Sequence, residues 1–279
     1  MLTDATADLA LTLILAVTRR VGEGERLIRS GTPWAWSIDF LVGRELRGKT
    51  LGVVGYGAIG RATAERARAF GMDVIFTASR CTDEPGQVDL GDLLSRADIV
   101  TLHCPLTLET RGLIDADALT RMKPTAYLVD TARGPIVDEA ALAAALRDGI
   151  VAGAALDVFE HEPDVHPELL KLENVVLLPH LGSATVETRT AMALLACDSV
   201  LAVLDGQQAP TPSFSGPDCS PGLRGRRPRR GPDGAVTTRL NHATVRSIWR
   251  SREQRHCRQV QGICRQTSLV WASSMEVVE

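Results

Sequence analysis

Short apolar runs alternate with longer segments of helical period along the first 212 residues of the chain. This alternation is typical of βαβ units, in which helices cover both faces of a parallel sheet. It predicts a first helix over Thr3–Arg20, where Leu9, Leu13 and Val17 recur every four residues. It also predicts strands at Thr50–Val54, Asp73–Thr77, Ile99–Leu102, Ala126–Val129, Val151–Leu156 and Val175–Leu178.

Helices are expected between most of these strands. The clearest are Ala58–Phe70 and Asp138–Arg147, and a last helix is expected over Thr185–Leu204. The stretch after the first helix, which contains Trp34 and Trp36, is expected to be a loop. We therefore predict an α/β fold with a Rossmann-type, doubly wound parallel sheet.

The composition of the chain changes after residue 212. Residues 1–212 hold 19 Lys and Arg against 29 Asp and Glu, whereas residues 213–279 hold 12 Arg, no Lys and five acidic residues. We interpret the second part as an atypical, disordered basic tail, read from another frame or fused to the chain. A basic arm for nucleic acid is the alternative, although no recognition motif accompanies the arginines. A metal site at His256, Cys257 and Cys264 would lack a second ligand pair.

The remaining composition favours a cytoplasmic protein with no membrane anchor. The longest apolar stretch, Leu9–Val17, is interrupted by Thr12 and is too short to cross a bilayer. Asp4 and Asp8 lie where a signal peptide would carry positive charge. The six cysteines show neither paired metal-ligand spacing nor the density of a disulfide scaffold, so we expect reduced thiols.

A glycine motif indicates a dinucleotide site. Gly55, Gly57 and Gly60 form a GxGxxG pattern that directly follows an apolar run and opens a helix, the context that makes this pattern specific. The first glycine permits a tight turn, the second a close approach of the backbone to a pyrophosphate, and the third close packing of helix and strand. The N–H groups of Ala58 and Ile59 would face the phosphate oxygens.

The end of the next strand bears on the choice of cofactor. An NAD site would place an acid about twenty residues after the first glycine, but residues 76–80 contain none. Ser79 and Arg80 could instead hold the 2′-phosphate of NADP. We therefore predict NADP(H), with NAD(H) as the alternative in which Arg80 is a solvated strand-end residue and Asp83 a late substitute for the acid.

Five ordered motifs resemble the D-isomer-specific 2-hydroxyacid dehydrogenases, and the likeness runs from about Leu2 to Pro212. The motifs are Gly48-Lys49-Thr50-Leu51-Gly52, Leu102-His103-Cys104-Pro105-Leu106-Thr107, Thr131-Ala132-Arg133-Gly134, Ala155-Leu156-Asp157-Val158-Phe159 with Glu162-Pro163, and Pro179-His180-Leu181-Gly182-Ser183-Ala184-Thr185. The resemblance implies hydride transfer between a nicotinamide and C2 of a 2-oxo acid. It also implies a homodimer, with the first helix and the tryptophan loop as the contact.

The resemblance places Arg133, Glu162 and His180 in the positions of the family's catalytic trio. The residue types suit the chemistry, because a histidine can give and take a proton near neutral pH. A carboxylate bonded to the imidazole would favour its protonated form, and a guanidinium could hold the substrate carboxylate. Taken singly, each residue also has an ordinary structural explanation.

Further cofactor contacts are implied by the same motifs. Asp157 is expected near the nicotinamide ring. The complete set of expected cofactor-binding residues is Gly55, Gly57, Ala58, Ile59, Gly60, Ser79, Arg80, Cys104, Pro105, Thr110, Thr131, Ala132, Arg133, Asp157, His180, Gly182 and Ser183. His161, Asp164 and His166 beside Glu162 could be offered as metal ligands, but the hydride mechanism needs no metal, so we predict none.

Within the family, the segment Gly182–Thr185 and the missing ribose acid resemble the glyoxylate and hydroxypyruvate reductases. Family members begin with most of a substrate-binding domain, which we expect to be absent here. Residues 1–184 would then be the dinucleotide-binding domain, 185–212 a helix that returns to the substrate domain, and 213–279 the tail. Two alternatives to the enzyme remain: a truncated, non-catalytic cofactor-binding fragment, and a corepressor-like protein that senses dinucleotides.

Overall fold

The computed structural model describes residues 1–80 and 83–211. The interpretation of residues 213–279 as a disordered basic tail lies outside the described residues, as does the metal-ligand alternative at His256, Cys257 and Cys264. None of the described helices combines the length and the apolar character that a membrane span needs.

The fold is an α/β sandwich built on one parallel sheet, as predicted. Its strands are β1 Thr50–Val54, β2 Asp73–Thr77, β3 Ile99–Leu102, β4 Tyr127–Asp130, β5 Gly153–Leu156 and β6 Val175–Leu177. They follow the order β2-β1-β3-β4-β5-β6, and every neighbouring pair is parallel. The strand order reverses at β1 and β3, and in open α/β sheets ligands bind at the carboxyl ends of the strands at such a point.

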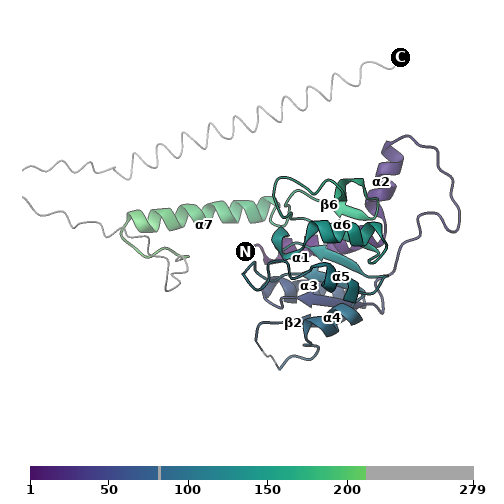
Figure 1. Cartoon of the computed structure of the whole chain (residues 1–279). Coiled ribbons are helices and arrows are strands. Elements are labelled where there is room, and N and C mark those ends of the chain that lie inside the picture. Colours follow the sequence, from purple (N-terminus) through teal and green to yellow (C-terminus); the bar gives the residue numbers. More distant parts are fainter. Residues whose placement is uncertain (81–82, 212–279) are drawn as a thin grey trace, which may run out of the picture. The chain divides into compact units, whose positions relative to one another are not determined.

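The described part of the chain has seven α-helices, of which the last follows the last strand and extends away from the sheet (Figure 1). They are α1 Thr3–Thr18, α2 Val21–Arg29, α3 Ala58–Ala69, α4 Leu90–Arg96, α5 Ala116–Arg121, α6 Glu139–Arg147 and α7 Val186–Leu204. Short 3₁₀ turns lie at Gly134–Ile136 and Leu169–Lys171.

Successive strand residues pack into two different cores, as the period of a strand requires. In β1, Leu51 and Val53 join the core formed with α1 and α3, whereas Val54 joins the core formed with α4, α5 and α6. In β4, Val129 joins the core formed with α1 and α3, and Leu128 joins the core formed with α4, α5 and α6. The sheet is therefore buried on both faces, which explains why its strands have apolar side chains on both sides.

Aspartate side chains define the starts of three helices. The N-cap carboxylates of Asp89, Asp115 and Asp138 accept backbone N–H groups in the first turns of α4, α5 and α6. Helix α3 differs, because its N-cap is Gly57 and no side chain of the described residues caps its first turn. The start of α3 therefore keeps free donors at the carboxyl edge of the sheet.

Helix α2 was not predicted, because the segment after α1 was expected to be a loop as a whole. It contains two glycines and is only nine residues long, and none of its residues is buried. Ion pairs of Arg20 with Glu23 and of Arg26 with Glu173 accompany it instead. The tryptophan segment that follows α2 has no regular structure, as expected.

Candidate functional site

The glycine motif forms a tight turn between β1 and α3. Gly55 has a φ of +96°, and a Cβ atom there would lie 2.5 Å from the backbone nitrogen of Cys104. A Cβ at Gly60 would lie 2.3 Å from the carbonyl oxygen of Gly55, so neither position accepts a side chain without movement. By contrast, nothing lies within 4 Å of a Cβ at Gly57. The turn is thus closed at Gly55 and Gly60 and open at Gly57, the N-cap of α3.

The end of β2 lies against this turn. The carbonyl oxygen of Thr77 accepts the N–H groups of Gly55 and Tyr56 at 3.2 and 3.1 Å. Ser79 and Arg80 follow after Ala78, and the Arg80 side chain forms no ion pair with another residue of the described chain. The segment after β2 therefore presents the Arg80 guanidinium at the place where an NAD site has a ribose-binding acid.

Two acids, Asp83 and Glu84, occur in the loop after β2, and the second of them is engaged elsewhere. Glu84 pairs with Arg61 of α3, and the Arg61 guanidinium lies 4.5 Å from the centre of the Tyr56 ring. Tyr56 in turn stacks on Phe76 with ring centroids 3.7 Å apart. These contacts hold Glu84 at the first turn of α3.

His180, which follows β6, contacts Glu162 of the loop between β5 and β6. Nδ1 of His180 lies 2.9 Å from Oε2 of Glu162, and Oε1 of Glu162 accepts the N–H of Phe159 at 3.1 Å. Partial burial would raise the pKa of Glu162, but the hydrogen bonds from His180 and Phe159, with the charge of Arg133, hold it below its ordinary value. Glu162 is therefore an ionised acceptor, so Nδ1 of His180 donates to it.

The backbone around His180 is held by Asp157 at the end of β5. His180 has a φ of +54°, a conformation uncommon for residues other than glycine. Its N–H donates to the Asp157 carbonyl oxygen at 2.9 Å, while the Asp157 carboxylate accepts the N–H groups of Leu181 and Gly182 at 2.6 and 2.8 Å. Burial raises the pKa of Asp157 in spite of these bonds. Asp157 thus orders the His180–Gly182 backbone.

Arg133 follows β4 and faces the same edge of the sheet. It is exposed, and its Nη1 donates to the carbonyl oxygen of Ala132 at 2.6 Å. The next residue, Gly134, is buried, and a Cβ there would lie 1.9 Å from the carbonyl carbon and oxygen of Phe159. The loop that carries Arg133 and the loop that carries Glu162 therefore touch at Gly134.

The loop after β3 contains Cys104, Pro105 and Thr110. Burial raises the pKa of the Cys104 thiol to about 11, so this cysteine stays protonated and is a poor nucleophile. The Thr110 hydroxyl donates to the carbonyl oxygen of Pro105 at 2.7 Å and closes the loop. Ser183 lies just beyond Gly182, whose carbonyl oxygen accepts the Thr6 hydroxyl at 3.0 Å.

Asp130 and Thr131 place unsatisfied polar atoms beneath this edge. Asp130 is fully buried; its Oδ1 accepts the N–H of Ala132 at 2.7 Å, whereas its Oδ2 has no partner among the described residues. The Thr131 hydroxyl is also unpaired there. Burial, with a smaller contribution from the charge of Asp157, raises the pKa of Asp130 to about 8. The Asp130 carboxyl is therefore protonated at neutral pH.

Stability should consequently fall as the pH rises from about 4 to 8, because the folded protein retains a proton on Asp130 that the unfolded chain has released. Asp130 changes the free energy of unfolding by at most about 1.4 kcal/mol per pH unit. Above the pKa of the folded protein it causes no further change. Asp130→Asn should flatten the slope of the unfolding free energy between pH 5 and pH 8, measured with urea.

Asp98→Asn is the control for this experiment. The pKa of Asp98 is low because its bonds to Thr50 and Lys123 outweigh partial burial, so its contribution is lost only as the pH falls into the acid range. Its slope between pH 5 and pH 8 should match that of the unchanged protein. If Asp130→Asn has the same slope as the unchanged protein and Asp98→Asn, Asp130 is not the source of the pH dependence.

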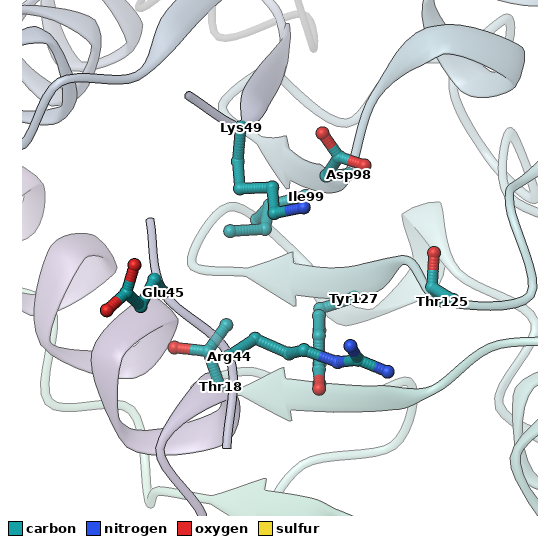
Figure 2. Close-up of a pocket in the computed structure, with 8 residues that line it drawn as sticks. All are labelled: Thr18, Arg44, Glu45, Lys49, Asp98, Ile99, Thr125 and Tyr127. Carbon is teal, nitrogen blue, oxygen red and sulfur yellow. The ribbon is translucent and has the colours of Figure 1, made fainter. Parts of the chain in front are cut away.

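A cavity of about 300 Å³ lies beside the His180–Glu162 pair. Apart from those two side chains its lining is apolar: Phe159, Pro163, Val165, Leu170, Leu177, Leu178 and Pro179. A second cavity, of about 130 Å³, lies at the opposite, amino edge of the sheet, where Lys49, Asp98 and Tyr127 begin or precede strands (Figure 2). Both basic and acidic side chains line the second cavity, and the length of β1 separates it from the glycine turn.

The expected site residues thus gather at the carboxyl edge, and two further residues contact the Glu162 loop there. They are Gly134, which ends the third motif without a predicted role, and Glu139, which lies outside all five motifs. The glycine directly after Arg133 is a weak sequence indication of a close contact at Gly134. An acid at the start of a helix is common, so the sequence does not mark Glu139. Among the described residues no group of three or more His, Cys, Asp or Glu side chains is arranged to hold a metal ion.

Fold and site together define a dinucleotide-binding α/β domain with a histidine–carboxylate contact at its carboxyl edge. The model of the D-isomer specific 2-hydroxyacid dehydrogenase NAD-binding domain matches residues 11–182, and the chain belongs to this family. A glyoxylate reductase of Thermofilum pendens is 49% identical over 221 residues, which are 75% of this chain and 65% of that protein. The chain therefore spans about two thirds of the length of that relative.

Solved structures give the same picture. The crystal structure of a Thermus thermophilus protein has a TM-score of 0.73 at 48% identity, over 76% of this chain and 68% of its own. An NADPH-dependent glyoxylate/hydroxypyruvate reductase of Sinorhizobium meliloti, in complex with NADP and malonate, has a TM-score of 0.70 at 37% identity, over 76% and 68%.

Proposed function

We propose that this protein is an NAD(P)-dependent dehydrogenase that reduces a small 2-oxo acid, such as glyoxylate or hydroxypyruvate, to the 2-hydroxy acid of D configuration. The observation that carries the proposal is the His180–Glu162 contact of 2.9 Å at the same sheet edge as the glycine turn. Relatives named glyoxylate reductase support the substrate class.

The cofactor would lie along the carboxyl edge of the sheet. Gly55 and Gly60 have no space for a side chain, whereas the space in front of Gly57 is open, so the turn fits a pyrophosphate at the start of α3. The ring would lie toward Asp157, His180 and Gly182. The unpaired Oδ2 of Asp130 and hydroxyl of Thr131 leave polar atoms beneath this part of the site.

A bound nicotinamide would supply a hydride to C2 of the substrate. Arg133 would hold the substrate carboxylate and place positive charge near the developing oxyanion. His180 would give the carbonyl oxygen its proton from Nε2, since Nδ1 is engaged by Glu162. The ionised Glu162 would favour the charged imidazole until that proton is transferred.

Arg80 is proposed to select NADPH over NADH. With no acid at the end of β2 and no ion pair to neutralise it, the guanidinium is available for a 2′-phosphate. We expect at least tenfold tighter binding of NADPH, which is about 1.4 kcal/mol, and loss of most of this difference in Arg80→Ala. Fluorescence titration with both cofactors measures it, and equal affinities of the unchanged protein would refute the role.

Helix α7 is proposed to contact a substrate-binding part of the protein. Its side chains are almost all accessible, and Val200, Val203 and Leu204 are exposed by 58%, 61% and 68%. Exposed apolar surface of this kind usually marks a contact. Homodimerisation is proposed through the segment around Trp36, which is 78% exposed, rather than through the inner face of α1, whose Leu13 and Ile14 are buried in the domain.

The reductase proposal is tested by adding glyoxylate to the full-length protein with NADPH and following the absorbance of the reduced cofactor. Oxidation that depends on glyoxylate supports the proposal. A protein that binds NADPH but oxidises none with any small 2-oxo acid would instead favour a cofactor-binding role without catalysis.

A further inference from the structure

The carboxylate of Glu139 is buried at the start of α6 and contacts two separate points of one loop. The residue is only 4% exposed. Its Oε1 accepts the N–H of Glu160 at 2.5 Å, and its Oε2 accepts the N–H of His166 at 3.1 Å. These two amides bracket the loop 160–166, which carries Glu162.

The loop has other ties to the domain: Val165 packs against the core formed with α4, α5 and α6, and Oε1 of Glu162 accepts the N–H of Phe159 at 3.1 Å. Within it, the N–H of Asp164 donates to the carbonyl oxygen of His161 at 2.9 Å, a bond that shapes the turn but does not anchor it. The peptide between Phe159 and Glu160 rests against Gly134. Among the described residues, Glu139 is the side chain whose hydrogen bonds join both ends of the loop to a helix of the domain.

The energetics favour a firm contact. A buried carboxylate has lost its hydration and needs hydrogen bonds in return, and charged acceptors form stronger bonds than neutral ones. The N-terminal turn of α6 also favours a negative charge at this position. Releasing either amide would leave the buried carboxylate without one of its hydrogen bonds, which costs free energy. Both ends of the loop are therefore held firmly to Glu139.

We infer that Glu139 is a positioning residue that fixes both ends of the 160–166 loop and thereby holds Glu162 against Nδ1 of His180. Nδ1 then carries the proton of the neutral ring, and Nε2 is left to exchange a proton with substrate. The use of this arrangement in a reductase rests on the proposed function. The arrangement itself does not, because it depends only on contacts within the chain.

A purely structural role would have a different consequence. Losing Glu139 would then lower the free energy of unfolding and leave the His180–Glu162 contact intact. Asp138 provides the matched control, since its carboxylate caps the same helix by accepting the N–H of Ala141 at 2.9 Å and contacts no part of the loop in the described structure. Asp138→Ala should cost stability without affecting the pair.

The experiment measures the tautomer of the His180 ring by ¹⁵N NMR in the full chain without ligand, at about pH 8.5, where an ordinary imidazole is neutral. The signals are assigned by their loss in His180→Ala. The unchanged protein and Asp138→Ala should show the Nδ1–H form. Glu162→Ala and Glu139→Ala should shift the ring toward the Nε2–H form, and Glu139→Gln, which keeps one acceptor, should lie between.

An Nδ1–H ring in a folded Glu139→Ala protein would overturn the inference. If that variant does not fold, Glu139→Gln decides, because a tautomer equal to that of the unchanged protein would overturn it equally. In the full-length protein, Glu139→Gln should also lower kcat by about tenfold or more with little change in the KM for NADPH. A full-length protein without reductase activity would refute the proposed function and leave the tautomer result to decide the role of Glu139.

Discussion

Replacing His180 by alanine in the full-length protein is expected to lower the rate of 2-oxo acid reduction by about 10²–10⁴-fold, the usual contribution of a positioned proton donor. The affinity for NADPH should stay nearly the same, because the glycine turn and Arg80 are untouched. Steady-state rates and a fluorescence titration of the cofactor separate the two effects.

His161→Ala is the matched control for this prediction. His161 lies on the Glu162 loop, is exposed, and contributes its backbone carbonyl rather than its ring to the contacts of the described structure. Its replacement should leave the rate within about twofold. A His180→Ala protein that turns over as fast as this control would remove His180 from the mechanism.

Gly134→Ala should have the largest effect on stability among single methyl additions near the site. The new Cβ would lie 1.9 Å from the carbonyl carbon and oxygen of Phe159, and backbone atoms cannot move aside as a flexible side chain can. We expect a loss at or above the upper end of the range of about 1–3 kcal/mol for overpacking, measured as the free energy of unfolding in urea. Reductase activity should fall with it, because the Arg133 and Glu162 loops meet there.

Gly24→Ala serves as its control. Gly24 lies within α2, and a Cβ there would meet only the Leu41 side chain at 3.9 Å, an ordinary contact. Alanine should therefore leave the stability unchanged or raise it by up to about 1 kcal/mol through better helix propensity. Equal stabilities of the two variants would show that the Phe159–Glu160 peptide does not rest on Gly134.

The strands could be predicted closely from the sequence. β1, β2 and β3 have the predicted bounds, because short apolar runs between turn residues leave little choice of position. β4 is displaced by one residue and β5 begins two residues later than predicted, since apolar residues continue beyond the ladder there. Helix α2 was missed, because it is short, contains two glycines and buries none of its residues, while ion pairs accompany it.

The site could be predicted less completely. The glycine turn has its own local signal, but the meeting of Glu162 and His180 depends on two loops that fold from different strands, and only the resemblance to the family indicated it. Glu139 lies 21 residues before the amide of Glu160 that it contacts, so no local pattern marks it. The preference for NADPH remains a prediction, because Arg80 has no described partner that defines its role.

The most direct test of the proposed dehydrogenase is the product formed from hydroxypyruvate. The full-length protein with NADPH should consume one cofactor for each molecule reduced and form glycerate of the D configuration, as the family's specificity for the D isomer requires. Chiral chromatography of the product identifies the enantiomer. L-glycerate, or reduced cofactor that persists in the presence of hydroxypyruvate and glyoxylate, would contradict the account.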